Sequence, residues 1–154
     1  MNRSDQKKVR RIDDATWQIT DSLFGATVYS FLLCGRERAV LIDSGFGLTD
    51  LKHITDELTP LPVSVVDTHG HLDHISCNHQ YDTVYLHPAD EPVFQEHSRR
   101  DFRLMLLRGT LAQAKLPPFL LSLPVIKGRI ERYATLPRRD NRAHRRMNSL
   151  FLKN

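Results

Sequence analysis

Hydrophobic and polar positions in the first forty residues predict consecutive β-strands. Residues 16–19 alternate polar and apolar side chains, which is the pattern of a half-buried strand. Residues 26–34 are rich in Val, Tyr, Phe and Leu, and the polar stretch 35–38 separates them from the apolar run 39–42. Two apolar runs joined by a short polar turn predict a β-hairpin.

After residue 42 the pattern alternates between helix and strand. Thr49 follows a glycine-containing turn, and the sequence predicts it as the N-cap of a helix that reaches Leu58. The remaining expected elements are strands at 63–67 and 83–86 and helices at 88–96 and 99–115. Strands that alternate with helices predict a layered α/β (α+β) domain with a mixed sheet.

The length and composition agree with one folded domain. The chain has 154 residues, of which 40% are hydrophobic and 26% charged, so it can build one core. No apolar run approaches the roughly 20 residues that span a bilayer, so no membrane partner is expected. Residues 1–14 lack the apolar stretch of a secretion signal. Because two cysteines are too few for a disulfide scaffold, we expect a reducing, cytoplasmic location.

The net charge of +4 comes from the end of the chain. Residues 1–126 hold 13 basic and 16 acidic residues, whereas residues 127–154 hold 9 basic and 2 acidic residues. A basic segment can contact nucleic acid or another anionic surface. We expect a solvated end instead, and a nucleic acid is not the expected partner.

Four side chains that can bind a metal ion lie within six residues: His69, His71, Asp73 and His74. They directly follow the apolar strand that ends at Asp67, where α/β sheets place their binding sites. On a turned loop the first two histidines can bind one cation, and the Asp-His pair can hold a second. Imidazole with carboxylate suits zinc, while iron or manganese stays open. The alternative is a histidine-rich surface turn.

The sequence Thr-His-Gly-His-Leu-Asp-His at 68–74, preceded by the strand and turn at 40–45, resembles the metallo-beta-lactamase-fold superfamily of metal-dependent hydrolases. The resemblance covers residues 12–98 and implies an αββα sandwich with up to two zinc ions. It assigns His69 and His71 to the first ion and Asp73 and His74 to the second. It also implies that Asp73 is catalytic and orients the attacking hydroxide.

Further residues take their expected roles from this resemblance. Asp43, in an Asp-Ser-Gly turn, is similar to the acid that lies beneath the metal loop of the family, as a second-shell partner. Asn78 is the second such candidate, although the family's Gly-Gly-Asn is Ser-Cys-Asn here. Cys77 is expected to be a small buried thiol, with a metal-proximal or redox-sensitive thiol as the alternative.

The family's later ligands have no counterpart of the same pattern in this chain. His144 stands among three arginines, Arg142, Arg145 and Arg146, which oppose cation binding. We therefore expect 1–154 to be a single metallo-beta-lactamase-like domain that is truncated at its C-terminus. Within it, 99–137 is expected to be a helical or irregular cap region and 138–154 a basic, disordered tail. The source of the missing ligands stays open.

The expected function is hydrolysis of an ester, thioester, lactone or similar bond in a small molecule by a metal-activated water. Whether this short chain is itself an active enzyme is left open, as is an oligomeric state. Two alternatives come from other classes. One is an inactive fragment that binds metal weakly, and the other is a nucleic-acid binder that uses the basic C-terminal tail.

Overall fold

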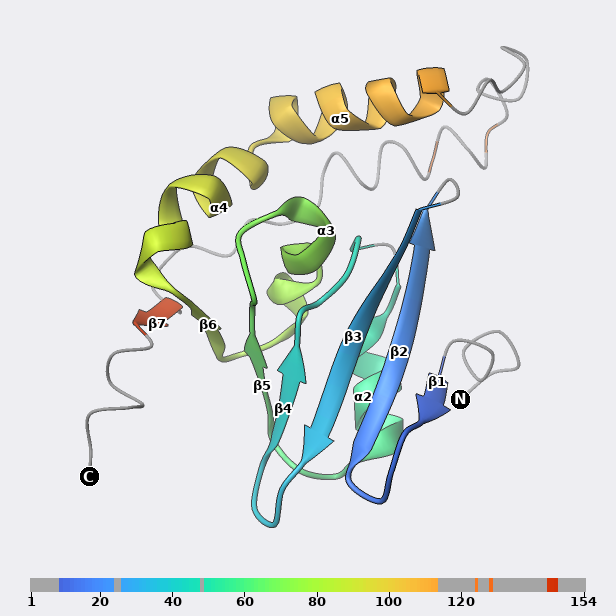
Figure 1. Cartoon of the computed structure of the whole chain (residues 1–154), viewed down its shortest axis with the longest axis vertical. Coiled ribbons are helices and arrows are strands. Elements are labelled where there is room, and N and C mark those ends of the chain that lie inside the picture. The colour runs from blue at the N-terminus through green and yellow to red at the C-terminus, as the bar shows by residue number, and fades with distance from the viewer. Residues whose placement is uncertain are drawn as a thin grey trace.

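One mixed β-sheet with helices packed against it forms the framework of the protein (Figure 1). The computed structural model describes residues 9–23, 26–47 and 49–113, together with Pro124, Gly128 and 144–146. The elements in chain order are β1 (Val9–Arg11), β2 (Thr16–Leu23), β3 (Ala26–Cys34), β4 (Ala39–Ile42), α2 (Leu51–Leu58), β5 (Val63–Val66), α3 (Leu72–Ile75), β6 (Val84–Leu86), α4 (Glu91–His97), α5 (Arg100–Gln113) and β7 (His144–Arg146). Short 3₁₀ turns at Asn78–Gln80 and Pro88–Asp90 precede β6 and α4, respectively.

The strands lie in the sheet in the order in which they occur in the chain. β1 to β4 pair antiparallel, whereas β4, β5, β6 and β7 pair parallel. The hairpin predicted at 26–34 and 39–42 is confirmed, and the first predicted strand extends to Leu23. The α/β (α+β) fold class with a mixed sheet is therefore confirmed. Of the two sheets in the expected αββα sandwich, the described residues form one.

The first helix begins one residue later than the sequence predicts. Asp50, not Thr49, is the N-cap of α2, and its carboxylate accepts a hydrogen bond from the His53 backbone N–H. The Thr49 hydroxyl instead donates to Asp21 on β2 at 3.0 Å. Thr49 therefore hydrogen-bonds to a residue far away in the sequence, Asp21, instead of capping the helix as the local pattern predicts.

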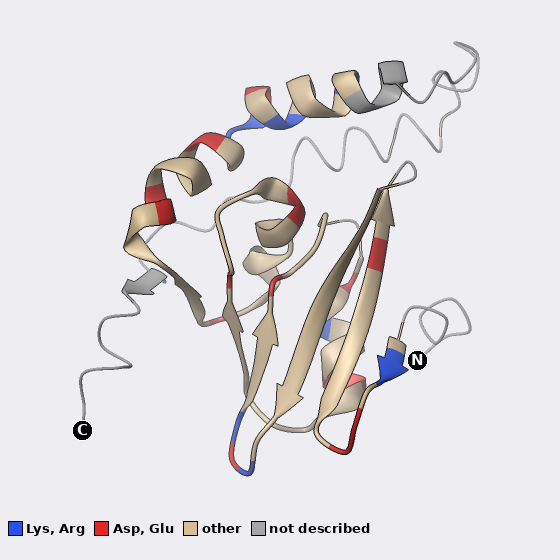
Figure 2. Cartoon of the chain, viewed as in Figure 1, with Lys and Arg blue, Asp and Glu red and all other residues tan. Residues whose placement is uncertain are grey.

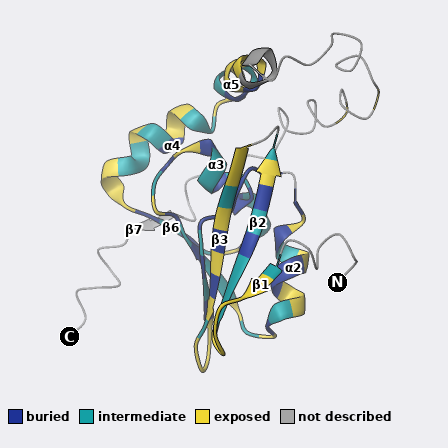
Figure 3. Ribbon diagram, turned by 45° about the vertical axis from the view of Figure 1, so that its right-hand side comes forward, coloured by how far each residue is buried: buried dark blue, intermediate teal, exposed yellow. Residues whose placement is uncertain are grey.

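The main core lies between α2 and one face of the sheet. Ile19, Leu32 and Leu41 contribute from the strands, and Leu51 and Ile54 from the helix. The strands alternate accordingly between buried and exposed positions (Figure 3). The opposite face of β3 carries Tyr29, Phe31 and Leu33, whose exposed fractions lie between 37% and 48%. No charged residue occurs within β3, β4, β5 or β6, and charges gather in turns and helices (Figure 2).

The cap region and the tail are only partly described. α5 confirms a helix over most of 99–115, but the rest of the predicted cap region lies outside the described residues except for Pro124 and Gly128. Within the expected tail, β7 lies beside β6, with His144 opposite Val84. Among the described helices, none has the length and apolarity required to cross a membrane.

Candidate metal centre

Two loops from neighbouring parallel strands build the candidate site. Asp43 follows β4, and the histidine-rich loop that begins at Thr68 follows β5. These strands pair in parallel across the crossover through α2, so both loops leave the same edge of the sheet. The edge that the sequence predicts as the binding site therefore collects residues about 25 positions apart.

The Asp43 carboxylate determines which nitrogen carries the proton in two histidines. It lies 2.8 Å from His74 Nδ1, and because a carboxylate only accepts, His74 Nδ1–H donates to it. The Thr68 hydroxyl donates its one proton to Asp43 as well, at 2.8 Å. Thr68 Oγ1 must therefore accept from His69 Nδ1–H, at 2.9 Å. Both imidazoles consequently keep Nε2 for another partner, as metal-binding histidines do.

The backbone at Asp43 is held in an unusual conformation. Its φ is 57°, in the left-handed region that few residues other than glycine enter. Gly45 and Gly47 in the same turn also have positive φ, and Asp21 accepts the Phe46 N–H at 3.0 Å. The turn is therefore fixed from β2, and it directs the Asp43 carboxylate toward the histidine loop.

The hydrogen bonds and burial around Asp43 shift the pKa values of the ionisable residues in the site. The hydrogen bond to Asp43 raises the pKa of His74 above its ordinary value, although burial opposes this shift. Burial by itself would raise the pKa of Asp43, but the hydrogen bonds from His74 and Thr68 outweigh it and lower the pKa. Burial and the neighbouring His74 and His71 lower the pKa of His69. Without metal, these shifts favour the ionised form of Asp43 and the protonated form of His74, and they disfavour protonation of His69.

The distances between side chains test whether these residues fit a cation. Asp73 Oδ2 lies 3.5 Å from His74 Nε2. With Zn–N and Zn–O bonds of about 2.0–2.2 Å, two ligands of one tetrahedral ion lie roughly 3.4 Å apart. The Asp-His pair thus fits one cation in both chemistry and separation. The rings of His69 and His71 are 4.6 Å apart between centroids, and those of His69 and His74 4.1 Å.

The donor set is nevertheless incomplete where the structure describes the chain. No group of three or more histidine, cysteine or acidic side chains among those residues is arranged to hold a metal ion. The structure brings the four predicted ligands near one another in pairs, His69 with His71 and with His74, and His74 with Asp73. The predicted Asp43 hydrogen-bonds to His74. The assignment of individual residues to metal ions stays a prediction.

Asn78 is buried and forms hydrogen bonds to two residues that closely follow β4 and β5. Its Nδ2 donates to Asp67 Oδ2 at 2.7 Å, and its Oδ1 accepts from Ser44 Oγ at 2.7 Å. Burial raises the pKa of Asp67 well above its ordinary value. Asn78 therefore connects the ends of β4 and β5 on which the two site loops begin.

α4 contributes a residue that sequence reasoning missed. His97 is the last residue of α4, and its Nδ1 accepts the Leu72 N–H at 3.2 Å. Its ring also stacks on His71, with centroids 4.6 Å apart. Since Nδ1 accepts, Nε2 of neutral His97 carries the proton, the opposite arrangement to His69. No local sequence signal marks this role, because α4 meets the loop only in the folded chain.

Gly70 explains how α4 approaches the loop so closely. A Cβ at this position would lie 2.6 Å from the backbone nitrogen of Phe94 on α4.

Cys77, two residues beyond α3, is buried, and burial raises the pKa of its thiol to about 12. The expectation of a small buried thiol is therefore confirmed.

The fold and the histidine-rich loop together define an α+β protein with a candidate metal centre at the carboxyl ends of its parallel strands. A profile of the metallo-beta-lactamase superfamily matches residues 24–133, more than half of the chain. The chain therefore belongs to the metallo-beta-lactamase superfamily. No curated protein matches the sequence.

The solved structures that are similar to this chain include several metallo-beta-lactamases. One from Pontibacter korlensis is 23% identical, with a TM-score of 0.49 over 58% of this chain and 47% of that chain. One from Erythrobacter litoralis, with beta-mercaptoethanol in its active site, is 18% identical, with a TM-score of 0.48 over 58% and 45%. DIM-1 exposed to ceftazidime is 15% identical, with a TM-score of 0.48 over 57% and 46%. The matches thus span less than half the length of these proteins.

Proposed function

We propose that this chain is a metal-dependent hydrolase that acts on small ester-like substrates such as esters, thioesters or lactones. The observation that carries the proposal is the Asp73–His74 pair, separated by 3.5 Å while Asp43 holds the other nitrogen of the histidine. Zinc is the proposed ion, with iron or manganese as alternatives. A bound divalent cation supplies Lewis-acid polarisation of the scissile group and acidifies water.

The chain's own residues take distinct parts in this proposal. His69 and His71 would hold one cation, and Asp73 and His74 a second. Asp43 keeps the proton of His74 on Nδ1 and, through Thr68, that of His69, which leaves Nε2 of each ring available. Asp73, whose side chain is 38% exposed, can also accept a hydrogen bond from the attacking water and orient it.

A second candidate function has a specific observation in its favour. Since no three ligands converge among the described residues, the chain alone could bind metal weakly and lack activity. This is the inactive-fragment alternative. The matched proteins are more than twice as long as the matching part, so the activity, substrate and partners of a whole protein remain part of the proposal.

The deciding experiment is metal titration of the purified chain with hydrolysis of p-nitrophenyl acetate measured in parallel. The proposal expects tight binding of one to two zinc equivalents and zinc-dependent turnover. The double variant His69→Ala/His71→Ala and the single variant Asp73→Asn should each lose both. Weak, sub-stoichiometric binding without turnover supports the inactive fragment instead.

A matched control separates the site from general histidine binding. His53→Ala removes an exposed histidine on α2, outside the cluster. It should leave zinc stoichiometry and turnover unchanged. If it lowers both as strongly as the loop variants do, zinc binds nonspecifically and the proposal fails.

We also propose a cytoplasmic location. Both cysteines, Cys34 and Cys77, are free, as a reducing compartment maintains them. The expected partner is a small molecule rather than a nucleic acid, and an oligomeric state is left to measurement.

A further inference from the structure

The side of the sheet that faces away from the core carries a continuous row of apolar side chains. On β3 this side holds Tyr29, Phe31 and Leu33, which are 48%, 37% and 42% exposed. Residues that pair across neighbouring strands point to the same side of a sheet, so the register extends this surface beyond β3. It continues through the partly buried residues Val40 and Ile42 on β4, Val66 on β5 and Tyr85 on β6. These seven residues are called the apolar face.

Charge is absent from this surface between β2 and β6, as far as the structure describes it (Figure 2). Asp21 is a charged residue within these strands, but alternation places it with Ile19 on the core side. Arg10, opposite Gln18 on the edge strand β1, brings a charge to the rim. A partner selected by charge therefore gains little here, whereas a second copy of the same surface meets no like charge at its centre.

The size of the surface can be compared with the size that a dimer needs. The strands from β2 to β6 have 8, 9, 4, 4 and 3 residues. At about 3.3 Å per residue and about 4.8 Å between strands, they cover roughly 450 Å² as a flat surface. Projecting side chains raise the accessible area above this value. Two copies face to face therefore bury about 1,000 Å² or more, which is the lower limit for a specific interface.

We propose that this chain forms a homodimer in which the apolar faces of two copies pack against each other. Two-fold symmetry lets one patch serve both copies, so no second complementary surface is required. Two sheets that pack in this way lie about 10 Å apart, with their strands turned by about 30°. Tyr29, Phe31 and Tyr85 supply the aromatic side chains that the centres of interfaces favour, and Arg10 supplies a charged rim.

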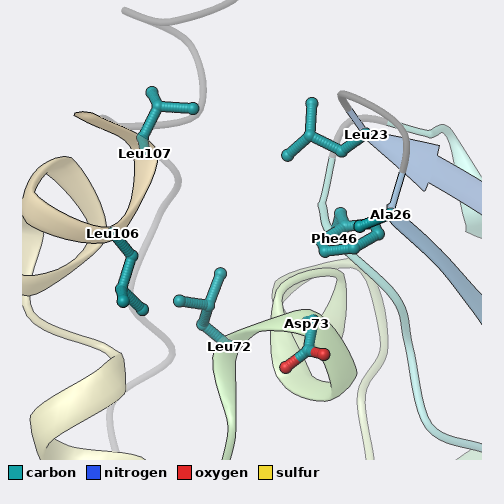
Figure 4. Close-up of a pocket in the computed structure, with 7 residues that line it drawn as sticks. All are labelled: Leu23, Ala26, Phe46, Leu72, Asp73, Leu106 and Leu107. Carbon is teal, nitrogen blue, oxygen red and sulfur yellow. The ribbon is translucent and has the colours of Figure 1, made fainter. Parts of the chain in front are cut away.

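The apolar face does not include the residues of the candidate metal centre. Those residues belong to the loops that follow β4 and β5. An apolar pocket beside Asp73 is lined by the end of the β2–β3 hairpin, Phe46, Leu72 and α5, and it contains no residue of the apolar face (Figure 4). The dimer proposal therefore goes beyond the proposed function and does not depend on it.

Sedimentation equilibrium of the full chain from about 1 μM to about 500 μM tests the association directly. EDTA and a thiol reductant are present, so neither a metal ion between surface histidines nor a Cys34 disulfide can join two copies. The expected result is a reversible monomer–dimer equilibrium with a micromolar dissociation constant, because the buried area is small. In dilute solution the chain is then monomeric. A monomer at every concentration, or growth beyond the dimer, would overturn the proposal.

Substitutions compare the apolar face with an exposed apolar residue elsewhere. Phe31→Thr and Leu33→Thr remove apolar surface, and threonine favours strands, so the sheet is retained. Each should weaken dimerisation at least about tenfold, and Phe31→Lys should abolish it because it buries a charge. Met105→Lys on α5, where Met105 is 56% exposed, is the matched control and should leave dimerisation unchanged. If the variants of the apolar face dimerise as strongly as this control, the proposal is wrong.

A measurement on the unmodified sequence locates the interface without any variant. Copies labelled at their leucine methyl groups are mixed with unlabelled copies, and nuclear Overhauser effects between the two kinds of copy are recorded. Leu33 should contact aromatic protons of the other copy, whereas its neighbour Leu32, which is 0% exposed, should not. Contacts between copies that come from α5 or another surface instead of Leu33 would overturn the proposal.

Discussion

Asp43 is the residue on which the chemistry of the candidate site most depends. One carboxylate receives the His74 ring N–H, the Thr68 hydroxyl and the Thr68 backbone N–H. Its left-handed backbone conformation places it where these three donors meet. Asparagine tolerates this conformation, so Asp43→Asn removes the charge with little change in backbone.

Asp43→Asn should change how the stability of the metal-free protein depends on pH. The raised pKa of His74 means that its contribution is present below the ordinary value of 6.5 and is lost as pH rises through the raised value. The lowered pKa of Asp43 means that its contribution is present above 3.8 and is lost as pH falls through the lowered value. Between pH 3.8 and pH 6.5, the free energy of unfolding of Asp43→Asn should therefore be lower than that of the unmodified protein by about 1.5–3 kcal/mol. Outside this pH range the two proteins should differ by less. Urea unfolding at several pH values measures this difference, and a difference independent of pH would contradict the pairing.

His97 should affect the metal site without binding metal itself. His97→Ala removes the acceptor of the Leu72 N–H and the ring beside His71, so zinc affinity should fall roughly 10–100-fold. His97→Phe keeps a ring beside His71 and should recover part of the loss. Competition with a zinc-binding dye gives the affinity, and the visible spectrum of the cobalt form reports the ligand geometry. Unchanged affinity and spectrum in His97→Ala would show that His71 is oriented without it.

The two thiols should react very differently. Cys77 is 1% exposed and its pKa is raised to about 12, whereas Cys34 is partly exposed. Only a thiolate attacks a disulfide reagent, so the native chain should react rapidly at Cys34 alone near pH 8. Absorbance of the thiolate released from Ellman's reagent counts the reactive thiols. Rapid reaction of the Cys34→Ser variant before unfolding would show that Cys77 is accessible.

At the scale of elements, the contact between α4 and the histidine loop positions the site. The sequence predicts both elements, but it does not predict that they touch. Gly70 permits the contact because α4 backbone atoms occupy the space where a side chain would begin. The Leu72–His97 hydrogen bond then joins the start of α3 to the end of α4.

Two glycine substitutions test this contact. Gly70→Ala places a methyl group against the Phe94 backbone and should destabilise the protein by about 1–3 kcal/mol while weakening zinc binding. Gly109→Ala on α5 is the matched control, because a Cβ there meets no described atom outside the backbone of its own helix within 4 Å. It should stabilise the protein by roughly 0.5–1 kcal/mol, since alanine favours helix. Thermal unfolding compares the two, and equal effects would mean that α4 does not pack on the loop.

For the whole molecule, the two faces of the sheet differ in what covers them. One face buries the core against α2, while the other leaves apolar side chains of β3 partly exposed. The described residues form one sheet, whereas the resemblance implies a family fold with two sheets. Two adjacent leucines on β3, one on each face of the sheet, allow the contributions of the two faces to stability to be compared.

Leu32 is 0% exposed and Leu33 is 42% exposed. Leu32→Ala leaves a cavity in the core and should cost about 2–5 kcal/mol. Leu33→Ala lies on the other face and should change stability by less than about 1 kcal/mol. Chemical denaturation measures both, and a large loss in Leu33→Ala would show that this face is packed in solution.

The sequence by itself did not predict β1, α3 or β7, but it determined the order of most elements, the hairpin, the mixed sheet and the cluster of four candidate ligands. These follow from local information, because alternation and short spacings decide which residues share a face or a loop. The role of Asp43 beneath the metal loop was predicted from the resemblance of its Asp-Ser-Gly turn to the family, and not from residue spacing. The helix beginning at Asp50 was missed by one residue, because Thr49 has a tertiary partner in Asp21.

Only the tertiary structure decided how the clustered side chains are oriented. The protonated nitrogen of His69 depends on Thr68 and Asp43, and the ring of His71 lies against His97 from another helix. The apolar pocket at Asp73 joins a hairpin, a turn and α5. These arrangements depend on contacts between residues far apart in the chain, and such contacts form only when the sheet and helices pack.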